Sequence, residues 1–318
     1  MPHQPGTSAV SQDKFLTDMS VANVNDPMGF VADRVFPVVA APNISGAYPI
    51  YTAADWNRDV AQRVPLGGAP VRSGFNITSG SYSCEEWGIE HAIPDAVSKN
   101  ADDPIKPDED GAAFVAEAIK IRRERRFAAA YFVTGVWGTT LDVSGTTQWD
   151  TASGSDPIGQ IKTARLTVQL AIGRMPNYIL MNLNVFEALA EHPDIKEKFK
   201  YTSSDSVTTD MLARVFHVDE VIVGSAVYET ADEGATSSRA HALGNHCLVG
   251  YRAPRPSLRM PSCGYTITWS GTGNAQGISV DRYRDEKHRS DVIRAFDYSD
   301  IKLVSSDAGY MLLDAVSA

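Results

Sequence analysis

The sequence predicts an α+β fold, and three observations support this. Residues 37–74 contain five prolines and four glycines, so a helix cannot run through them and an extended loop is expected. One long helix is expected at 111–133, after the acidic, turn-rich segment NADDPIKPDEDG. Beyond a Trp/Gly/Thr-rich stretch, short helices and strands alternate and lead into a strand-rich end, which is typical of mixed α and β structure.

Composition describes an ordinary folded protein. Of 318 residues, 43% are hydrophobic and 21% charged, so the chain can bury a core and disorder of the whole chain is excluded. The formal net charge of -10 argues against a protein that coats DNA with its whole surface, because phosphate neutralisation requires excess Lys and Arg. Local basic patches remain compatible with this balance.

Targeting signals and cysteines indicate a cytoplasmic setting. The start MPHQPGTSAVSQDKF lacks the cationic and apolar regions of a secretory signal, and no apolar stretch reaches membrane-spanning length. The cysteines Cys84, Cys247 and Cys263 are scattered and odd in number, so they predict neither a disulfide framework nor a CxxC metal pair. We expect a reducing compartment.

The first part of the chain is expected to be extended. Residues 1–36 are predicted to form an arm with one short helix, which uses apolar positions between Phe15 and Val24. Within 37–74, the segments AYPIYTAADW and RDVAQRV are strand-like and predict a long hairpin, whose ten-residue arms would reach about 33 Å. Such an arm cannot bury itself. Residues 75–93 are expected to form a strand.

The helix at 111–133 contains the basic segment IKIRRERRFAAAYF, with five cations in fourteen residues. We expect Lys120 and Glu124 to pair at i, i+4, and the Arg stems to pack while their guanidinium groups reach carboxylates or solvent. A structural role is favoured over direct phosphate contact. The residues expected on its packed face are Phe114, Ala118, Ile121, Arg125, Ala128 and Phe132.

The second half predicts a compact unit of helices and strands. Helices are expected at 157–172, 184–190 and 208–216, and strands at 177–182, 219–227 and 246–253. His192 is expected at a helix end, where a cation interacts well with the helix dipole. From residue 265 the chain is strand-rich, and its two long runs are expected to pair with the strand at 75–93.

Chemical motifs give no assembled active site. GTGNAQG has the wrong spacing for a dinucleotide-binding loop and precedes a strand, so it predicts a turn. His241, His246 and Cys247 lack a second pair of ligands at zinc-finger spacing, and alternation along a strand explains them better. Neither a GxSxG elbow nor a cysteine-protease signature occurs. No catalytic residue, cofactor or metal site is predicted.

Successive blocks of the chain resemble one known family. These blocks are NDPMGFVADRVFPVV, YPIYTAADWNRDVAQRVPLGGAP, YSCEEWGIEHAIPDAVSKNADDP with the Arg-rich helix, TGVWGTTLDVSGTTQWDTASGSDPIGQI, PNYILMNLNVFEALAEHPDIKEKFKYT, LARVFHVDEVIVGSAVYETADEG and APRPSLRMPSCGYTITW. In this order they are similar to the major capsid proteins of tailed bacteriophages, with the Hong Kong 97-type fold. The resemblance implies an N-terminal arm (1–36), an extended loop or E-loop (37–74), a peripheral domain (75–155) with spine helix 111–133, an axial domain (156–264), and return strands with a final axial strand (265–318).

The resemblance also implies a function and partners. The chain would assemble as hexamers and pentamers into an icosahedral shell that encloses double-stranded DNA, and would not be an enzyme. Its partners would be copies of itself, a scaffolding protein, a portal, in some cases a decoration protein, and DNA held non-specifically on the inner face, with no membrane involved. Its location would be the virion capsid, assembled in the bacterial host cytoplasm.

Aromatic and Arg residues on exposed elements are how interfaces are often anchored, and they supply the candidate intersubunit contacts. For the loop residues, the alternative to an intersubunit contact is a loop tip that is simply exposed to solvent. The candidates are Trp56, Arg58 and Arg63 on the loop, and Arg122, Arg123, Arg125 and Arg126 on the spine helix.

Two departures from the family pattern lead to expectations. No lysine lies between Lys14 and Lys99, so the E-loop lacks the amine that some members use for isopeptide cross-links and a non-covalent shell is expected. Fewer than forty residues precede the loop, so we expect a separate scaffolding protein rather than a fused one.

Two alternatives remain open. An encapsulin-like compartment shares the fold but carries a cargo-binding N-terminal helix, whereas this N-terminus is polar and contains Pro and Gly. Nucleic acid or protein co-purifying with particles discriminates between these two. A soluble α/β enzyme would instead be a monodisperse monomer whose melting temperature responds to a ligand.

Overall fold

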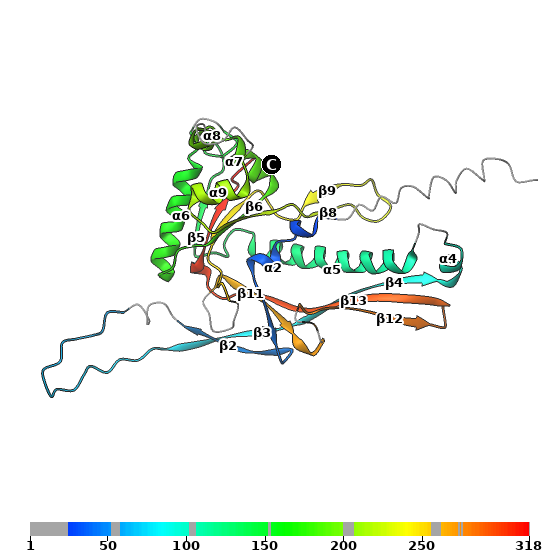
Figure 1. The fold of residues 1–318 in the computed structure, drawn as a ribbon, viewed down its shortest axis with the longest axis horizontal. Coiled ribbons are helices and arrows are strands. Elements are labelled where there is room, and N and C mark those ends of the chain that lie inside the picture. Colours follow the sequence, from blue (N-terminus) through cyan, green and yellow to red (C-terminus); the bar gives the residue numbers. More distant parts are fainter. Residues whose placement is uncertain are drawn as a thin grey trace, which may run out of the picture.

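The computed structural model describes residues 25–51, 58–101, 106–151, 154–199, 207–255, 262–272, 274 and 276–317. A flat, elongated lower part carries a long helix above a sheet, a compact part rises at one end, and two hairpins project from the body (Figure 1). The short helix expected before Val24 lies outside the described residues. From Asn25 on, the chain forms η1 (Pro27–Gly29) and α2 (Ala32–Val35).

The lower sheet is organised around its longest strand, β13 (Ser290–Leu303). β12 (Ile278–Asp285) and β4 (Glu85–Pro94) pair with its first part, and β11 (Gly264–Trp269) pairs with its last part, all antiparallel. β1 (Val38–Ala41) adds to β11 in parallel. The pairing expected between the C-terminal runs and the strand at 75–93 is therefore right for β13 and wrong for β12, which contacts only β13 in this sheet.

Helix α5 (Pro107–Tyr131) lies along this sheet (Figure 1). It begins with proline at its first position and three acids in its first turn, both of which favour a helix start. Its buried residues follow an i, i+4 row that includes the salt-bridged Arg123 and ends at Phe127. The packed face expected from the sequence is right for Ala128 and Phe132, which enter the core, and wrong for Phe114 and Arg125. Phe114 is 56% exposed and Arg125 is exposed. The buried residues are Gly111, Val115, Ile119, Arg123, Glu124 and Phe127.

The compact part contains a second sheet in the order β5-β14-β10-β6-β7. Its strand β6 (Tyr178–Asn182), between β10 and β7, is buried throughout, because helices and loops cover both faces. Alternate residues enter two cores: Ile179 packs with the helices above it, and Leu180 packs towards α5. The other strands are β5 (Thr139–Asp142), β7 (Glu220–Gly224), β10 (Cys247–Gly250) and β14 (Gly309–Leu313).

Four helices cover this second sheet: α6 (Pro157–Ile172), α7 (Leu183–Glu191), α8 (Pro193–Phe199) and α9 (Thr209–Phe216). α6 has the expected bounds, whereas α8 was not predicted. His192 lies at the end of α7, as expected, and is buried, and its Nδ1 accepts a hydrogen bond from the Asp194 N–H.

Two hairpins project from the body on opposite sides (Figure 1). β2 (Ser45–Tyr51) pairs with β3 (Ile77–Ser83), and β8 (Val227–Glu229) pairs with β9 (Arg239–His241). The strand expected in RDVAQRV is wrong, since residues 58–64 are irregular. The strand expected at 75–93 is divided into β3 and β4, and the run 219–227 ends as β7 at Gly224. The remaining elements are α4 (Asp95–Lys99), η2 (Ser270–Thr272) and η3 (Ser306–Ala308).

Candidate assembly surfaces

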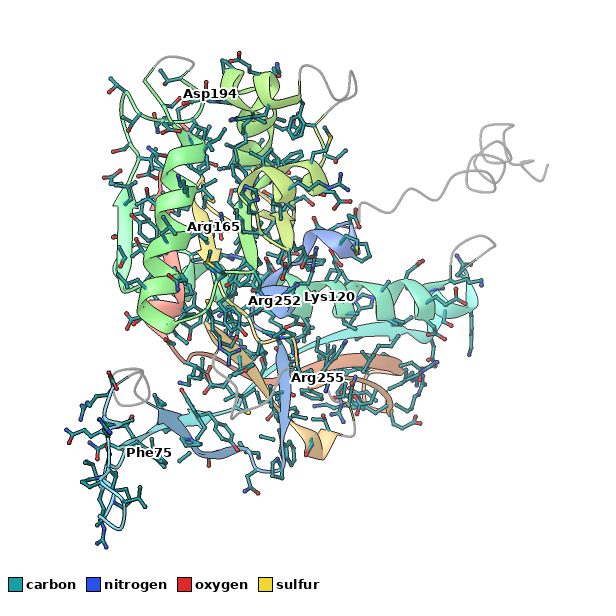
Figure 2. The ribbon with its side chains drawn as sticks, turned by 60° about the vertical axis from the view of Figure 1, so that its left-hand side comes forward. Phe75, Lys120, Arg165, Asp194, Arg252 and Arg255 are labelled. Atoms are coloured by element: carbon teal, nitrogen blue, oxygen red, sulfur yellow. The ribbon has the colours of Figure 1, made fainter. Side chains whose placement is uncertain are left out.

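The described part of the segment that connects β2 to β3, together with the start of β3, is exposed throughout. Residues 58–79 are exposed at every position, and Leu66 is fully accessible. Figure 2 shows this segment, with Phe75, well away from the rest of the molecule. Val71 and Phe75 are each about half exposed. Apolar side chains held this far from any core gain stability only by burial in another molecule.

The loop candidates for intersubunit contact fall within or beside this segment. Arg58 and Arg63 are exposed, as expected for residues that face a neighbour. Trp56 lies outside the described residues. The apolar residue Leu66 was not singled out from the sequence, although the Pro-flanked run VPLGG marks the tip of an extended loop.

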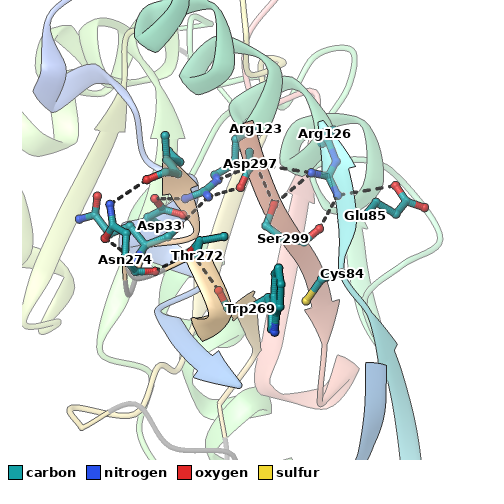
Figure 3. A network of polar contacts seen from close by, with 12 residues as sticks. Asp33, Cys84, Glu85, Arg123, Arg126, Trp269, Thr272, Asn274, Asp297 and Ser299 are labelled. Carbon is teal, nitrogen blue, oxygen red and sulfur yellow. Dashed lines mark hydrogen bonds and ion pairs between the residues drawn. The ribbon is translucent and has the colours of Figure 1, made fainter. Parts of the chain in front are cut away.

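Arg123 is the centre of a buried polar network that joins three elements (Figure 3). Its Nη2 lies 2.5 Å from Asp297 Oδ1 on β13, and its Nη1 lies 2.8 Å from Asp33 Oδ2 on α2. Nη2 also donates to the backbone oxygen of Gln276 at 2.8 Å. Burial would by itself lower the pKa of Arg123, but the carboxylates of Asp33 and Asp297 together raise it. The guanidinium group therefore fastens α5 to the sheet and to the N-terminal segment.

The position of Arg123 corrects its expected role. Its side chain is only 4% exposed and its contacts lie within the subunit, so it is not available to a neighbour. Arg126 extends the same network, with Nη1 3.1 Å from Ser299 Oγ (Figure 3). Arg122 stacks 4.3 Å above the Trp87 ring, and Arg125 lies 4.1 Å above Tyr228. Of the four helix candidates, Arg122 and Arg125 have exposed side chains.

Glu124, the next residue of α5, also anchors the N-terminal segment. Its Oε2 accepts hydrogen bonds from the backbone N–H groups of Val31, at 3.0 Å, and Ala32, at 2.9 Å, where α2 begins. The predicted pair with Lys120 is therefore wrong. Burial raises the pKa of Glu124 to about 7, although these two hydrogen bonds act in the opposite direction. Asn25 is held nearby, since its N and Nδ2 both donate to Glu117 Oε1.

The raised pKa of Glu124 predicts a pH dependence of stability. Between about pH 4.5 and about pH 7 the folded chain keeps a proton that the unfolded chain has lost, so stability falls as pH rises through this window. We expect the unfolding free energy of wild type to fall by about 3 kcal/mol relative to Glu124→Gln across this range. Urea unfolding of unassembled subunit at several pH values measures this. Parallel curves for both proteins contradict the prediction, and Glu109→Gln, an exposed acid of the same helix, is the control.

The described residues contain neither a cluster of metal ligands nor a membrane-spanning helix. There, His, Cys, Asp and Glu do not form any group of three that could hold a metal ion. None of the helices described is both long and apolar enough to cross a membrane. The Nδ1 of His246 accepts a hydrogen bond from the Asp314 N–H, and Cys247 is buried in β10. Both residues therefore have structural roles.

Sequence comparison matches the chain to phage capsid proteins. Residues 134–245 match the family described as phage major capsid protein E. The chain is 25% identical over 307 residues to the "Major capsid protein" of Burkholderia phage BcepMu, which covers 94% of this chain and 95% of that protein. Both matches carry the name of a capsid protein, which agrees with the expectation that the chain is not an enzyme.

Solved structures share the fold. A phage-related protein from Bordetella bronchiseptica RB50 superposes with a TM-score of 0.72 at 23% identity, covering 92% of this chain and 95% of that one. The capsid protein of cyanophage P-SCSP1u has a TM-score of 0.57 at 10% identity, covering 92% and 89%. An encapsulin from Synechococcus elongatus PCC 7942 has a TM-score of 0.54 at 12% identity, covering 98% and 95%. The chain has the Hong Kong 97-type fold, and its sequence is similar to phage major capsid proteins.

Proposed function

We propose that the chain assembles as hexamers and pentamers into an icosahedral shell that encloses double-stranded DNA, as a virion capsid formed in the bacterial cytoplasm. The observation that carries the proposal is the fully exposed segment 58–79, which has no core of its own to enter. Identical subunits joined head to tail close into rings, and a projecting loop is suited to reach across such a contact. We assign the arm, E-loop, peripheral and axial domains to the ranges expected from the sequence.

The loop can contribute much of the association energy. Burying one Val, Leu or Phe side chain stabilises by about 1.5–3 kcal/mol, and Leu66, Val71 and Phe75 are all exposed here. Part of this gain is lost in ordering the loop. Because every subunit repeats the contact, a modest gain at each one suffices for a stable shell.

The exposed cations of α5 suit a weak, non-specific contact with packaged DNA. Lys120, Arg122 and Arg125 are exposed, and none of the three forms an ion pair within the described ranges. Three phosphate contacts per subunit would make binding strongly salt-dependent without fixing a sequence. On a chain with a net charge of -10, so limited a patch leaves the DNA mobile.

Electron microscopy with light scattering tests the proposal directly. The full chain is expressed alone and with its neighbouring genes, which supply the scaffolding protein and portal that we propose as partners. We expect closed shells, or rings of five or six, at least in the second case. A stable monomer under both conditions contradicts the proposal.

An encapsulin-like compartment is the second candidate, and the shared fold with an encapsulin favours keeping it. The content of native particles distinguishes the two. Nuclease-protected double-stranded DNA supports the phage capsid, whereas one co-purifying protein enclosed without nucleic acid supports the compartment.

A further prediction concerns covalent bonds in the shell. No lysine occurs between Lys14 and Lys99, so the E-loop has no amine for an isopeptide bond. Purified shells boiled in detergent are expected to run on a denaturing gel as monomer, near 34.5 kDa. A ladder of oligomers that survives boiling and reducing agent contradicts this.

A further inference from the structure

A cationic pocket lies between α6, α8 and α9, on the compact part of the molecule. Its volume is about 390 Å³, and apolar residues such as Ile161 and Phe216 form its floor. Figure 2 labels Arg165 on α6, which lines this pocket. The other basic residues that line it are Lys162, Lys198, Arg214 and His217, and it has no acidic lining residue.

Among the described residues, the charges in this pocket have no counter-ion. In the described parts of the chain, neither Arg165 nor the other Lys and Arg residues of the pocket form an ion pair. The Nε of Arg165 is buried and has no hydrogen-bond partner in the part of the chain that the structure describes. Burial lowers the pKa of Arg165, and no carboxylate offsets this. Repulsion between these cations and the unsatisfied N–H donor of Arg165 both cost free energy. A bound oxyanion would remove both costs, because it attracts the cations and accepts the hydrogen bond.

Matching acidic groups lie at the tip of the β8–β9 hairpin. Asp232 and Glu233 are both exposed, and neither side chain forms a hydrogen bond or ion pair with the described residues. The tip is held in shape, because Glu229 accepts hydrogen bonds from Ser237 Oγ, at 2.6 Å, and from the Ser238 N–H, at 2.5 Å. An acidic turn fixed in this way loses little conformational entropy on binding.

The two features face opposite ways, which is what a ring requires. In Figure 1, α6 lies at the left edge of the compact part and the β8–β9 hairpin projects to the right. In a head-to-tail ring, one side of each subunit contacts the opposite side of the next. We propose that the α6–α8–α9 pocket binds the carboxylates of Asp232 and Glu233 from the adjacent copy of the chain. The inference rests on the proposed assembly into rings.

A charge-swap experiment tests this contact. Arg165→Glu and Glu233→Arg are each expected to raise the protein concentration needed for assembly about tenfold or more, because each brings like charges together. Combining them should restore most of the loss, which a merely structural defect cannot do. Lys287→Glu, the same charge change in the β12–β13 turn, is the control. Melting temperatures identify variants that fail to fold, and Lys162→Glu, at an exposed position of the same pocket, then replaces Arg165→Glu.

A disulfide reporter makes the test independent of assembly yield. Cys introduced at Lys162 and at Glu233 should form intersubunit disulfides in oxidised particles and give a ladder on non-reducing gels. The native thiols contribute little background, because all three are buried and burial raises the pKa of Cys84 to about 11.

The outcomes separate the inference from the proposed function. Shells that form without a cross-link and without charge-swap rescue overturn the pocket contact and leave the capsid function standing. Inorganic phosphate that raises the melting temperature through Arg165, again without rescue, assigns the pocket to a free oxyanion and also overturns the contact. Wild type that never forms any ring or particle contradicts the proposed function and, with it, the inference.

Discussion

Arg123→Met is expected to lower the free energy of unfolding of the isolated subunit by about 3 kcal/mol. The change removes the cation that lies between Asp297 and Asp33, and the Asp297 side chain is only 2% exposed. A buried carboxylate without a partner stays uncompensated or binds a proton, and both are costly. Arg126 Nη1 lies 3.8 Å from Asp297 Oδ2 and retains part of the compensation, so we expect the lower end of the range for such losses.

Urea unfolding below the assembly concentration measures this loss. Arg122→Met is the matched control: the same chemical change one residue away, at an exposed side chain stacked on Trp87, where we expect less than about 1 kcal/mol. The double variant Arg123→Met/Asp297→Asn should recover part of the stability, because it removes the unpaired charge as well. Equal losses at Arg122 and Arg123 contradict the assigned role.

Elements with local signals were predicted well from the sequence. Helix α6 has the expected bounds because its ends are encoded in adjacent residues. The Asp156 Oδ1 accepts from the Gly159 N–H at 2.7 Å, Pro157 occupies the first helical position, and Gly173 ends the helix with a φ of 70°. Patterns of this kind depend on nothing outside a few neighbouring residues.

Features set by distant partners were not predicted. Arg123 is buried on α5 because Asp297, 174 residues away, supplies its counter-ion, whereas an apolar periodicity assigns the buried positions to residues such as Phe114. Likewise, the parallel pairing of Val38 with Thr266 joins segments that carry no mutual signal. The candidate contacts divide in the same way: exposure of Arg58 and Arg63 follows from local loop chemistry, but what they contact depends on another subunit.

Shortening the E-loop is expected to abolish shell formation while leaving the subunit folded. Replacing residues 60–73 with Gly-Ser removes only exposed positions and keeps the β2–β3 ladder from Ser45 to Tyr51 and from Ile77 to Ser83. We therefore expect a melting temperature within a few degrees of wild type, since surface changes alter stability by only about 0.5 kcal/mol. Light scattering and microscopy should show no closed shells.

A second variant separates the reach of the loop from its side chains. Replacing the same residues with an equally long Gly/Ser segment keeps the length but removes four exposed apolar side chains, those of Val60, Val64, Leu66 and Val71. If burial of apolar side chains drives the contact, this variant should also fail. Losing even two of these side chains costs about 3–6 kcal/mol at each interface, and every factor of ten in affinity is 1.4 kcal/mol. Shells of normal size formed by the shortened-loop variant would overturn the assembly role of this segment. The segment was chosen because its exposed apolar side chains, such as Leu66, Val71 and Phe75, lie far from the core of their own subunit.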